Sequence, residues 1–274
     1  MELKEIIKLA EQGYKGAQSK LGIMYQCGDG VEINLDEAIK WYRLAVEQCE
    51  DNAEFHLGCA YLDGVGITKN ISKGIRLIEL SASHNNYIAQ YTLGEFYKRG
   101  IYVEKDYEKA FYYLNLSARQ GFHNAQYVLG YMLMDGDKRN LKEALKYFYF
   151  SAHQGNAEAQ FALGCLYYNG DNVKKDIEKA IFFFKLASKQ NHTLALGNLG
   201  YIYENGEGVN KDLKKAFEYY MLAAENGDDV AQCTVAYMFE VGKGVSRNLS
   251  MALKYYKLAA KQENLAAKEK LKGL

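Results

Sequence analysis

The chain has 274 residues, of which 25 are Gly and none is Pro. At about 5% average usage, a chain of this length would carry roughly 14 prolines, and their absence favours long helical stretches, where Pro is costly. Apolar residues make up 49% and charged residues 25%, which excludes a disordered chain and allows a sizeable core. The 34 basic and 34 acidic residues balance, which argues against a generic nucleic-acid binder.

The N-terminal segment interrupts its apolar residues with charges and lacks the apolar core of a secretory signal. Since no window approaches 18 uninterrupted apolar residues, no membrane-spanning helix is expected. An odd number of cysteines without regular pairing favours free thiols in a reducing, cytoplasmic compartment, an expectation that a removed signal peptide would weaken. The cysteines are Cys27, Cys49, Cys59, Cys165 and Cys233.

A repeat of about 36 residues is the strongest signal in the chain. The dipeptide Leu-Gly occurs at one register in six copies, its glycines are 36, 36, 36, 34 and 36 residues apart, and a seventh copy has Val235-Ala236. Ala always stands five residues before the second member of the dipeptide, and Gly always stands six residues after it. Self-similarity at this period predicts a stack of supersecondary units. The six glycines are Gly22, Gly58, Gly94, Gly130, Gly164 and Gly200.

The first half of each unit is predicted to be a helix. In the unit around Gly94, the residues Ala89, Leu93 and Tyr97 recur at i, i+4 and i+8 and therefore share one face. Gly94 itself is expected to admit a neighbouring backbone. The helix should end at Gly100, since Gly tolerates the left-handed conformation that follows many helices.

The second half of each unit is predicted to be a further helix that begins after an Asn or Asp N-cap. In the same unit it follows Asp106, carries Ala110, Tyr113, Leu116 and Ala118 at helical spacing, and ends near Gly121. The N-cap positions of the seven copies are Asn34, Asn70, Asp106, Asn140, Asp176, Asp212 and Asn248.

In chain order, the repeats predict one all-α domain over residues 1–274. Residues 1–16 form an N-terminal half-repeat cap, residues 17–264 form seven repeats, and residues 265–274 form a polar C-terminal capping helix. The copy around Gly130 is two residues short, in the connector 137–139, where a deletion is best tolerated.

One run carries a family resemblance: Ala89-Gln90-Tyr91, Leu93-Gly94, Tyr97, Gly100, Val103, Lys105-Asp106 and Lys109-Ala110. It resembles the Sel1-like repeat, a relative of the tetratricopeptide repeat, over nearly the whole chain. The resemblance implies an α/α right-handed superhelical solenoid whose first helices line the inner surface. It also implies an adaptor that holds other proteins together. A cysteine-rich secreted branch linked to β-lactams fits poorly, because its repeats each carry a disulfide and the cysteines here fall in different registers.

A search for catalytic and metal-binding motifs finds little. No Ser is followed three residues later by Lys, no phosphate-binding loop occurs, and the five histidines are not at helical spacing from one another. We therefore expect no enzyme, cofactor or metal site. His56 lies three residues before Cys59, but structural thiols are favoured over a catalytic pair.

The favoured function is a non-enzymatic scaffold that binds a partner protein or peptide on the concave surface of its first helices. The face opposite the Ala-Leu-Tyr stripe offers polar and aromatic side chains, and Tyr is enriched at interfaces. The same tyrosines could instead pack against the next unit. The alternatives are an immunity or virulence-associated binder and, less favoured, a β-lactam or cell-wall hydrolase. The candidate binding residues are Glu95, Arg99, Tyr131, Asn198, Tyr201 and Tyr237.

Overall fold

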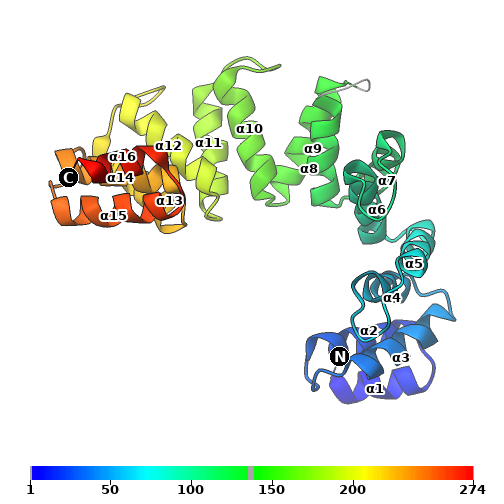
Figure 1. Ribbon diagram of the computed structural model, residues 1–274. Coiled ribbons are helices and arrows are strands. Elements are labelled where there is room, and N and C mark those ends of the chain that lie inside the picture. Colours follow the sequence, from blue (N-terminus) through cyan, green and yellow to red (C-terminus); the bar gives the residue numbers. More distant parts are fainter. Residues whose placement is uncertain (1, 135–138, 274) are drawn as a thin grey trace. The chain divides into compact units, whose positions relative to one another are not determined.

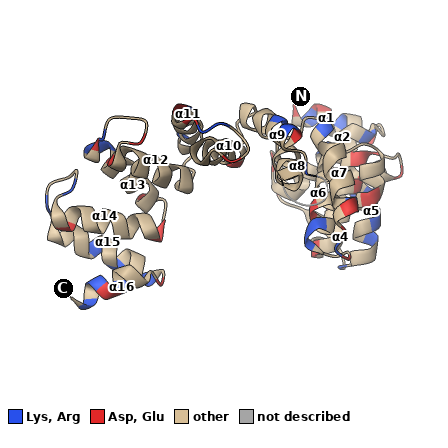
Figure 2. Cartoon of the chain, turned by 90° about the horizontal axis from the view of Figure 1, so that it is seen from above, with Lys and Arg blue, Asp and Glu red and all other residues tan. Residues whose placement is uncertain are grey.

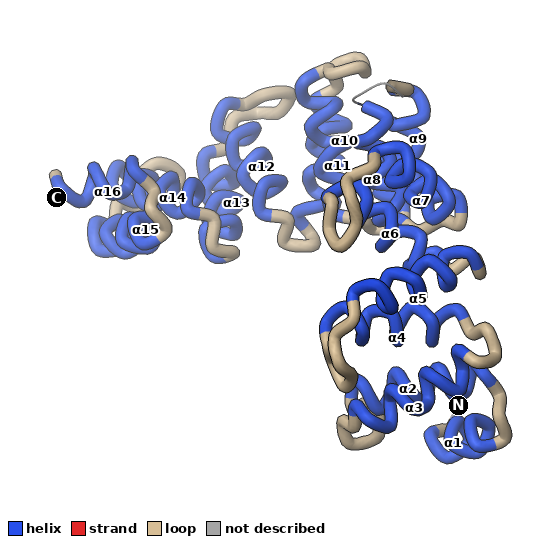
Figure 3. Tube along the Cα trace, turned by 45° about the vertical axis from the view of Figure 1, so that its right-hand side comes forward, coloured by secondary structure: helices blue, strands red, loops and turns tan. Residues whose placement is uncertain are grey.

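The computed structural model describes residues 2–134 and 139–273, and every regular element in those two ranges is an α-helix. The all-helical prediction is therefore confirmed. Figure 1 labels the helices and Figure 3 shows how they alternate with loops. The helices are α1 (Leu3–Glu11), α2 (Lys15–Cys27), α3 (Leu35–Val46), α4 (Asp51–Asp63), α5 (Ile71–Ser83), α6 (Tyr87–Arg99), α7 (Tyr107–Arg119), α8 (His123–Met134), α9 (Leu141–His153), α10 (Ala157–Asn169), α11 (Ile177–Ser188), α12 (Thr193–Asn205), α13 (Leu213–Glu225), α14 (Asp229–Val241), α15 (Leu249–Lys261) and α16 (Leu265–Lys272).

The chain divides into two compact units, residues 1–132 and residues 133–274. Within each unit, a helix packs chiefly against the helices that precede and follow it in sequence, and the first and second helix of one repeat pack most extensively. This nearest-neighbour packing is the pattern of a solenoid. One domain over residues 1–274 and a right-handed superhelix stay predictions.

The N-caps of the second helices are confirmed at all seven copies. Each Asn or Asp side chain accepts a hydrogen bond from the backbone N–H three residues further on, as Asp212 does from Lys215 at 2.9 Å. Such a bond satisfies one of the orphan donors at a helix start.

The glycines that end the first helices are confirmed wherever the structure describes them. Gly100, for example, has a φ of 71° and donates its N–H to the carbonyl of Phe96. Its counterparts Gly28, Gly64, Gly170, Gly206 and Gly242 adopt the same left-handed conformation. The corresponding prediction for Gly136, and most of the shortened connector, lie outside the described residues.

The Leu-Gly glycines do admit a close neighbour, but that neighbour is mainly a side chain rather than the predicted backbone. A Cβ on Gly94 would lie 2.6 Å from Leu114 Cγ, and a Cβ on Gly200 would lie 2.7 Å from the ring of Tyr220. The second helix therefore inserts a large side chain against Gly22, Gly58, Gly94, Gly164 and Gly200. The predicted apolar stripe of the second helix contained Tyr113 and Leu116 but not Leu114. The structure corrects this, since Leu114 is fully buried while Tyr113 and Leu116 are only partly buried.

The core of each unit is formed by the facing sides of its first and second helices. The predicted stripe of Ala89, Leu93 and Tyr97 is buried. The aromatic pairs of the second helices are also core residues, as in Tyr255 and Tyr256, which are 5% and 0% exposed. The opposite face of each first helix is thereby left for other contacts.

Candidate protein-binding surface

The six predicted binding residues fall into two sets, one in each compact unit. Glu95 and Arg99 on α6 and Tyr131 on α8 belong to the first unit. Asn198 and Tyr201 on α12 and Tyr237 on α14 belong to the second. Each set is described by itself.

The three tyrosines are substantially exposed. Tyr131, Tyr201 and Tyr237 occupy equivalent positions of their repeats and are 44%, 48% and 44% exposed. The ring of Tyr131 meets that of Tyr127 edge to face at 5.1 Å, and Lys270 Nζ lies 5.6 Å from the ring centre of Tyr237. Because each tyrosine is nearly half exposed, part of its surface remains accessible to a partner even where it contacts the next repeat.

The polar members of the two sets differ in accessibility. Glu95 is only 12% exposed, and it pairs with Lys98 at 2.9 Å and with Arg99 at 2.7 Å within its own helix. Arg99 is 62% exposed and is the accessible member of that group. Asn198 donates to the carbonyl of Leu194 at 2.8 Å, so its amide is partly engaged by its own helix.

Two ionic clusters beside the second-unit tyrosines were missed by the sequence reasoning. Glu204 accepts hydrogen bonds from Tyr220 at 2.9 Å and from Lys243 at 2.6 Å. Burial alone would raise the pKa of Glu204, but these hydrogen bonds and the charge of Lys243 outweigh burial and lower that pKa.

Glu240, one repeat further along, shows the same arrangement. It accepts from Tyr256 at 2.5 Å and from Lys270 at 3.1 Å, and these hydrogen bonds lower the pKa of its carboxyl. The available signal was the recurrence of Glu at one register of two successive copies, next to an exposed Tyr three residues earlier. Tyr201 and Tyr237 thus each have, three residues further along the same helix, a carboxylate that is paired with an ammonium group.

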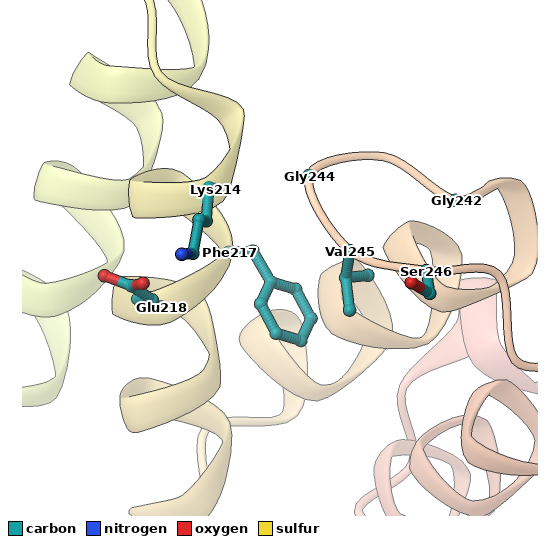
Figure 4. A pocket seen from close by; sticks show the side chains of 7 residues that line it. All are labelled: Lys214, Phe217, Glu218, Gly242, Gly244, Val245 and Ser246. Atoms are coloured by element: carbon teal, nitrogen blue, oxygen red, sulfur yellow. The ribbon is translucent and has the colours of Figure 1, made fainter.

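The connectors offer a second kind of surface. An open cleft of about 660 Å³ lies between α13 and the loop that follows α14. Figure 4 shows the Phe217 ring on α13 directed toward Val245 of this loop, while the charged ends of Lys214 and Glu218 point away from the loop. Basic and acidic residues are both present on the described helices and loops of each unit (Figure 2).

Two of the thiols, Cys59 and Cys165, have the properties of structural cysteines. All five cysteines lie in the described part of the chain and are free thiols, as predicted. Burial raises the pKa of Cys59 to about 11 and, likewise, that of Cys165 to about 11, which disfavours the thiolate that a nucleophile needs. His56, the candidate base for Cys59, stacks on Tyr42 with ring centres 5.5 Å apart.

Among the helices described between Leu3 and Lys272, none is both long and apolar enough to cross a bilayer.

Comparisons with known proteins agree with this architecture. The Sel1 repeat model matches seven segments, residues 16–48, 51–86, 88–122, 123–156, 157–192, 193–228 and 229–264. A Sel1 repeat protein from Oxalobacter formigenes is 30% identical, and the match covers 98% of this chain and 78% of that one, with a TM-score of 0.81. No curated protein matches the chain.

Two further solved structures are similar. One is a protective antigen present in uropathogenic Escherichia coli strains, at 31% identity and a TM-score of 0.65; the match covers 96% of this chain and 64% of the antigen. The other is an immunity protein from Pseudomonas aeruginosa, at 20% identity and a TM-score of 0.51, covering 79% of this chain and 82% of that one, which shows the fold alone. The matched repeats cover nearly the whole chain, and the chain therefore belongs to the Sel1 repeat family.

Proposed function

We propose that this chain is a non-enzymatic scaffold or adaptor that binds a partner protein or peptide through the exposed faces of its first helices. The observation that carries the proposal is the pair Tyr201 and Tyr237. These residues occupy the same position of successive repeats and are nearly half exposed on helices whose other faces are buried.

The chemistry of this surface supports recognition of a polypeptide. Tyr provides a large contact area at a small entropic cost, and its hydroxyl can still donate or accept. Glu204 and Glu240 follow the two tyrosines by three residues on the same helices and pair with Lys243 and Lys270, and Lys270 also lies over the ring of Tyr237. These charges are paired with one another. We expect them to form the polar rim of the interface, with the tyrosines as its anchors. In the first unit, Arg99 and Tyr131 are the exposed members of the corresponding set.

A narrower version of the proposal is an immunity or virulence-associated binder of one specific protein. Two of the similar structures are an immunity protein and a protective antigen. This version differs from the general scaffold only in the identity of the partner, so the same surface would be used.

The test replaces the two anchors and compares partner capture. Tyr201→Ala with Tyr237→Ala should leave the thermal midpoint nearly unchanged while weakening partner capture, by more than about 1 kcal/mol for each hot-spot residue. Capture is first measured by quantitative mass spectrometry of proteins retained from native lysate, and the affinity for the purified partner is then measured directly.

The matched control is Tyr112→Ala, which removes a tyrosine of similar exposure, 58%, from a second helix. This control should capture the partner as the unaltered chain does. Equal capture by the double variant and the control would contradict the proposal and would favour the connector surface instead. A large loss of stability in the double variant would show that the tyrosines are core residues.

A further inference from the structure

Four junctions between repeats share a side-chain bridge between two glutamines, and the junction of the second repeat departs from it. At four junctions, a buried Gln near the start of a first helix accepts a hydrogen bond from a Gln at the end of the following second helix. Its own amide group donates to a backbone carbonyl eight residues earlier. We call this arrangement the glutamine bridge. The Gln-to-Gln distances are 2.8 Å for Gln48–Gln18, 2.8 Å for Gln120–Gln90, 3.0 Å for Gln190–Gln160 and 3.0 Å for Gln262–Gln232.

In the second repeat, both glutamines of the bridge are replaced by ionisable residues. Glu54 on α4 stands at the register of Gln18 and Gln90, and His84 at the end of α5 stands at the register of Gln48 and Gln120. His84 Nδ1 lies 2.9 Å from Glu54 Oε2 and so reproduces one bond of the bridge.

The other oxygen of Glu54 has no such replacement. In the bridge, the corresponding atom is an amide nitrogen that donates to a carbonyl, whereas a carboxylate oxygen can only accept. Glu54 is 0% exposed, and its Oε1 has no hydrogen-bond partner. A buried acceptor without a partner is costly, and the cost is greater for a charged group. A cation bound to Oε1 of Glu54 would remove this cost.

The third unusual residue at this junction is Cys49, in the turn between α3 and α4. Its φ is 54°, a left-handed conformation that side chains with a Cβ adopt reluctantly. The equivalent positions hold residues that suit this conformation in six copies, and Glu263 in a seventh; the six are Gly13, Asn85, Gly121, Gly155, Asn191 and Gly227. Lys15 Nζ donates to the carbonyls of Gln48 and Cys49, at 3.3 and 3.1 Å, and so anchors this turn.

The three departures converge on one point. The sulfur of Cys49, a carboxylate oxygen of Glu54 and a ring nitrogen of His84 all lie within 4.8 Å of one another. Ligands on one tetrahedral Zn²⁺ lie about 3.2–3.8 Å apart, given Zn–S of about 2.3 Å and Zn–N or Zn–O of about 2.0–2.2 Å. The distances between the three ligand atoms would therefore have to shorten only slightly on metal binding, and Cys49 and His84 are both exposed.

The surrounding charges favour a cation. The negative charges of Asp51 and Glu50 act on Glu54, while His84 opposes them. A positive ion would relieve the repulsion among these three carboxylates.

We propose that Cys49, Glu54 and His84 form a binding site for a borderline-soft divalent cation of the Zn²⁺ class, which cross-links α3, α4 and α5. Thiolate, imidazole and carboxylate are the ligands that this class prefers, and three protein ligands leave a fourth position for water. Binding releases the thiol proton and the proton shared by His84 and Glu54, so affinity should fall as the pH falls. A search for local motifs missed the site because its ligands come from the turn before α4, from α4 itself and from the residue that follows α5.

The experiment uses the full chain, freed of metal with a chelator and then titrated with Zn²⁺ in competition with a chromophoric chelator. One equivalent should bind and raise the thermal midpoint. Co²⁺ should give the charge-transfer band of a thiolate–cobalt bond. Cys49→Asn, which installs the residue of two equivalent turns, should abolish that band and weaken Zn²⁺ binding by more than about tenfold, since loss of even an outer-shell partner costs about 10–100-fold.

A second variant separates metal binding from folding. Glu54→Gln with His84→Gln restores the glutamine bridge of the other repeats, so it should fold and should lose both Zn²⁺ binding and the Zn²⁺-dependent rise of the thermal midpoint. Cys27→Ser, which removes another exposed thiol, is the matched control and should bind Zn²⁺ as the unaltered chain does. The proposal is overturned if the chain fails to bind an equivalent of Zn²⁺. Equal binding by both ligand variants and by the control would overturn it as well.

Discussion

At the scale of single residues, the environment of a carboxylate decides what it does. Glu54 and Glu204 are both glutamates of first helices, yet the pKa of Glu54 is raised by burial and that of Glu204 is lowered by its hydrogen bonds. Glu204 receives donors from Tyr220 and Lys243, whereas one oxygen of Glu54 receives none. The sequence places the two glutamates at different registers but does not reveal the donors of Glu204, because these come from α13 and from the loop that follows α14.

The lowered pKa of Glu204 predicts a pH-dependent contribution to stability. The contribution of a carboxyl whose pKa is lowered on folding is complete above the unfolded-state value, about 4.3, and is lost as the pH falls through the folded-state value. Glu204→Gln keeps an acceptor but cannot titrate. The stability advantage of the unaltered chain over this variant should therefore shrink between about pH 6 and pH 3. Urea midpoints at a series of pH values measure it, and an advantage that stays constant with pH would contradict the assignment.

At the scale of elements, the contact between a Leu-Gly glycine and the second helix sets the spacing of each helix pair. Gly200 and Gly197 lie on the same helix, α12, but their surroundings differ. A Cβ on Gly200 would lie 2.7 Å from Tyr220, and a Cβ on Gly197 would have nothing within 4 Å. The ring of Tyr220 is held by its hydrogen bond to Glu204 and has little freedom to move away.

These two glycines form an internally controlled test of the packing. Gly197→Ala should be neutral or should stabilise by up to about 1 kcal/mol, because Ala is the better helix former. Gly200→Ala has the same propensity gain but overpacks the pair, so it should be less stable than Gly197→Ala by about 1–3 kcal/mol. Denaturant midpoints of the two variants are compared directly, and equal midpoints would show that α13 moves aside without cost.

At the scale of the whole molecule, stability should be the sum of local terms, since each repeat contacts mainly its neighbours. The last helix, α16, buries Ala267 against the core of the second unit and is tied to α14 by the ion pair of Lys270 and Glu240. Its removal should therefore destabilise the end of the second unit first.

Ending the chain after Asn264 tests this locality. Amide hydrogen exchange should become faster in α14 and α15, because they lose the contacts that α16 supplies, while residues 1–132, which have their own core, should keep their protection. Hydrogen exchange followed by mass spectrometry reads out each segment. A uniform loss of protection over the chain would mean that it unfolds as one cooperative body.

The sequence by itself determined the repeat, the helix pairs, the N-caps such as Asp106 and Asp212, and the terminating glycines such as Gly100. These features depend on backbone conformation and hydrogen bonds within a few residues, so local patterns specify them. The exposed tyrosines were also predictable, because helical periodicity assigns each residue to a face.

Only the tertiary structure decided which side chains meet between helices. The insertion of Leu114 against Gly94 and the convergence of Cys49, Glu54 and His84 depend on how elements up to about one repeat apart pack together. The repeat predicts where equivalent positions lie along the backbone. It does not predict what a residue that differs from the other copies at such a position will contact. The departures become informative once equivalent positions, such as Glu54 and Gln90, are compared in register and their contacts are known.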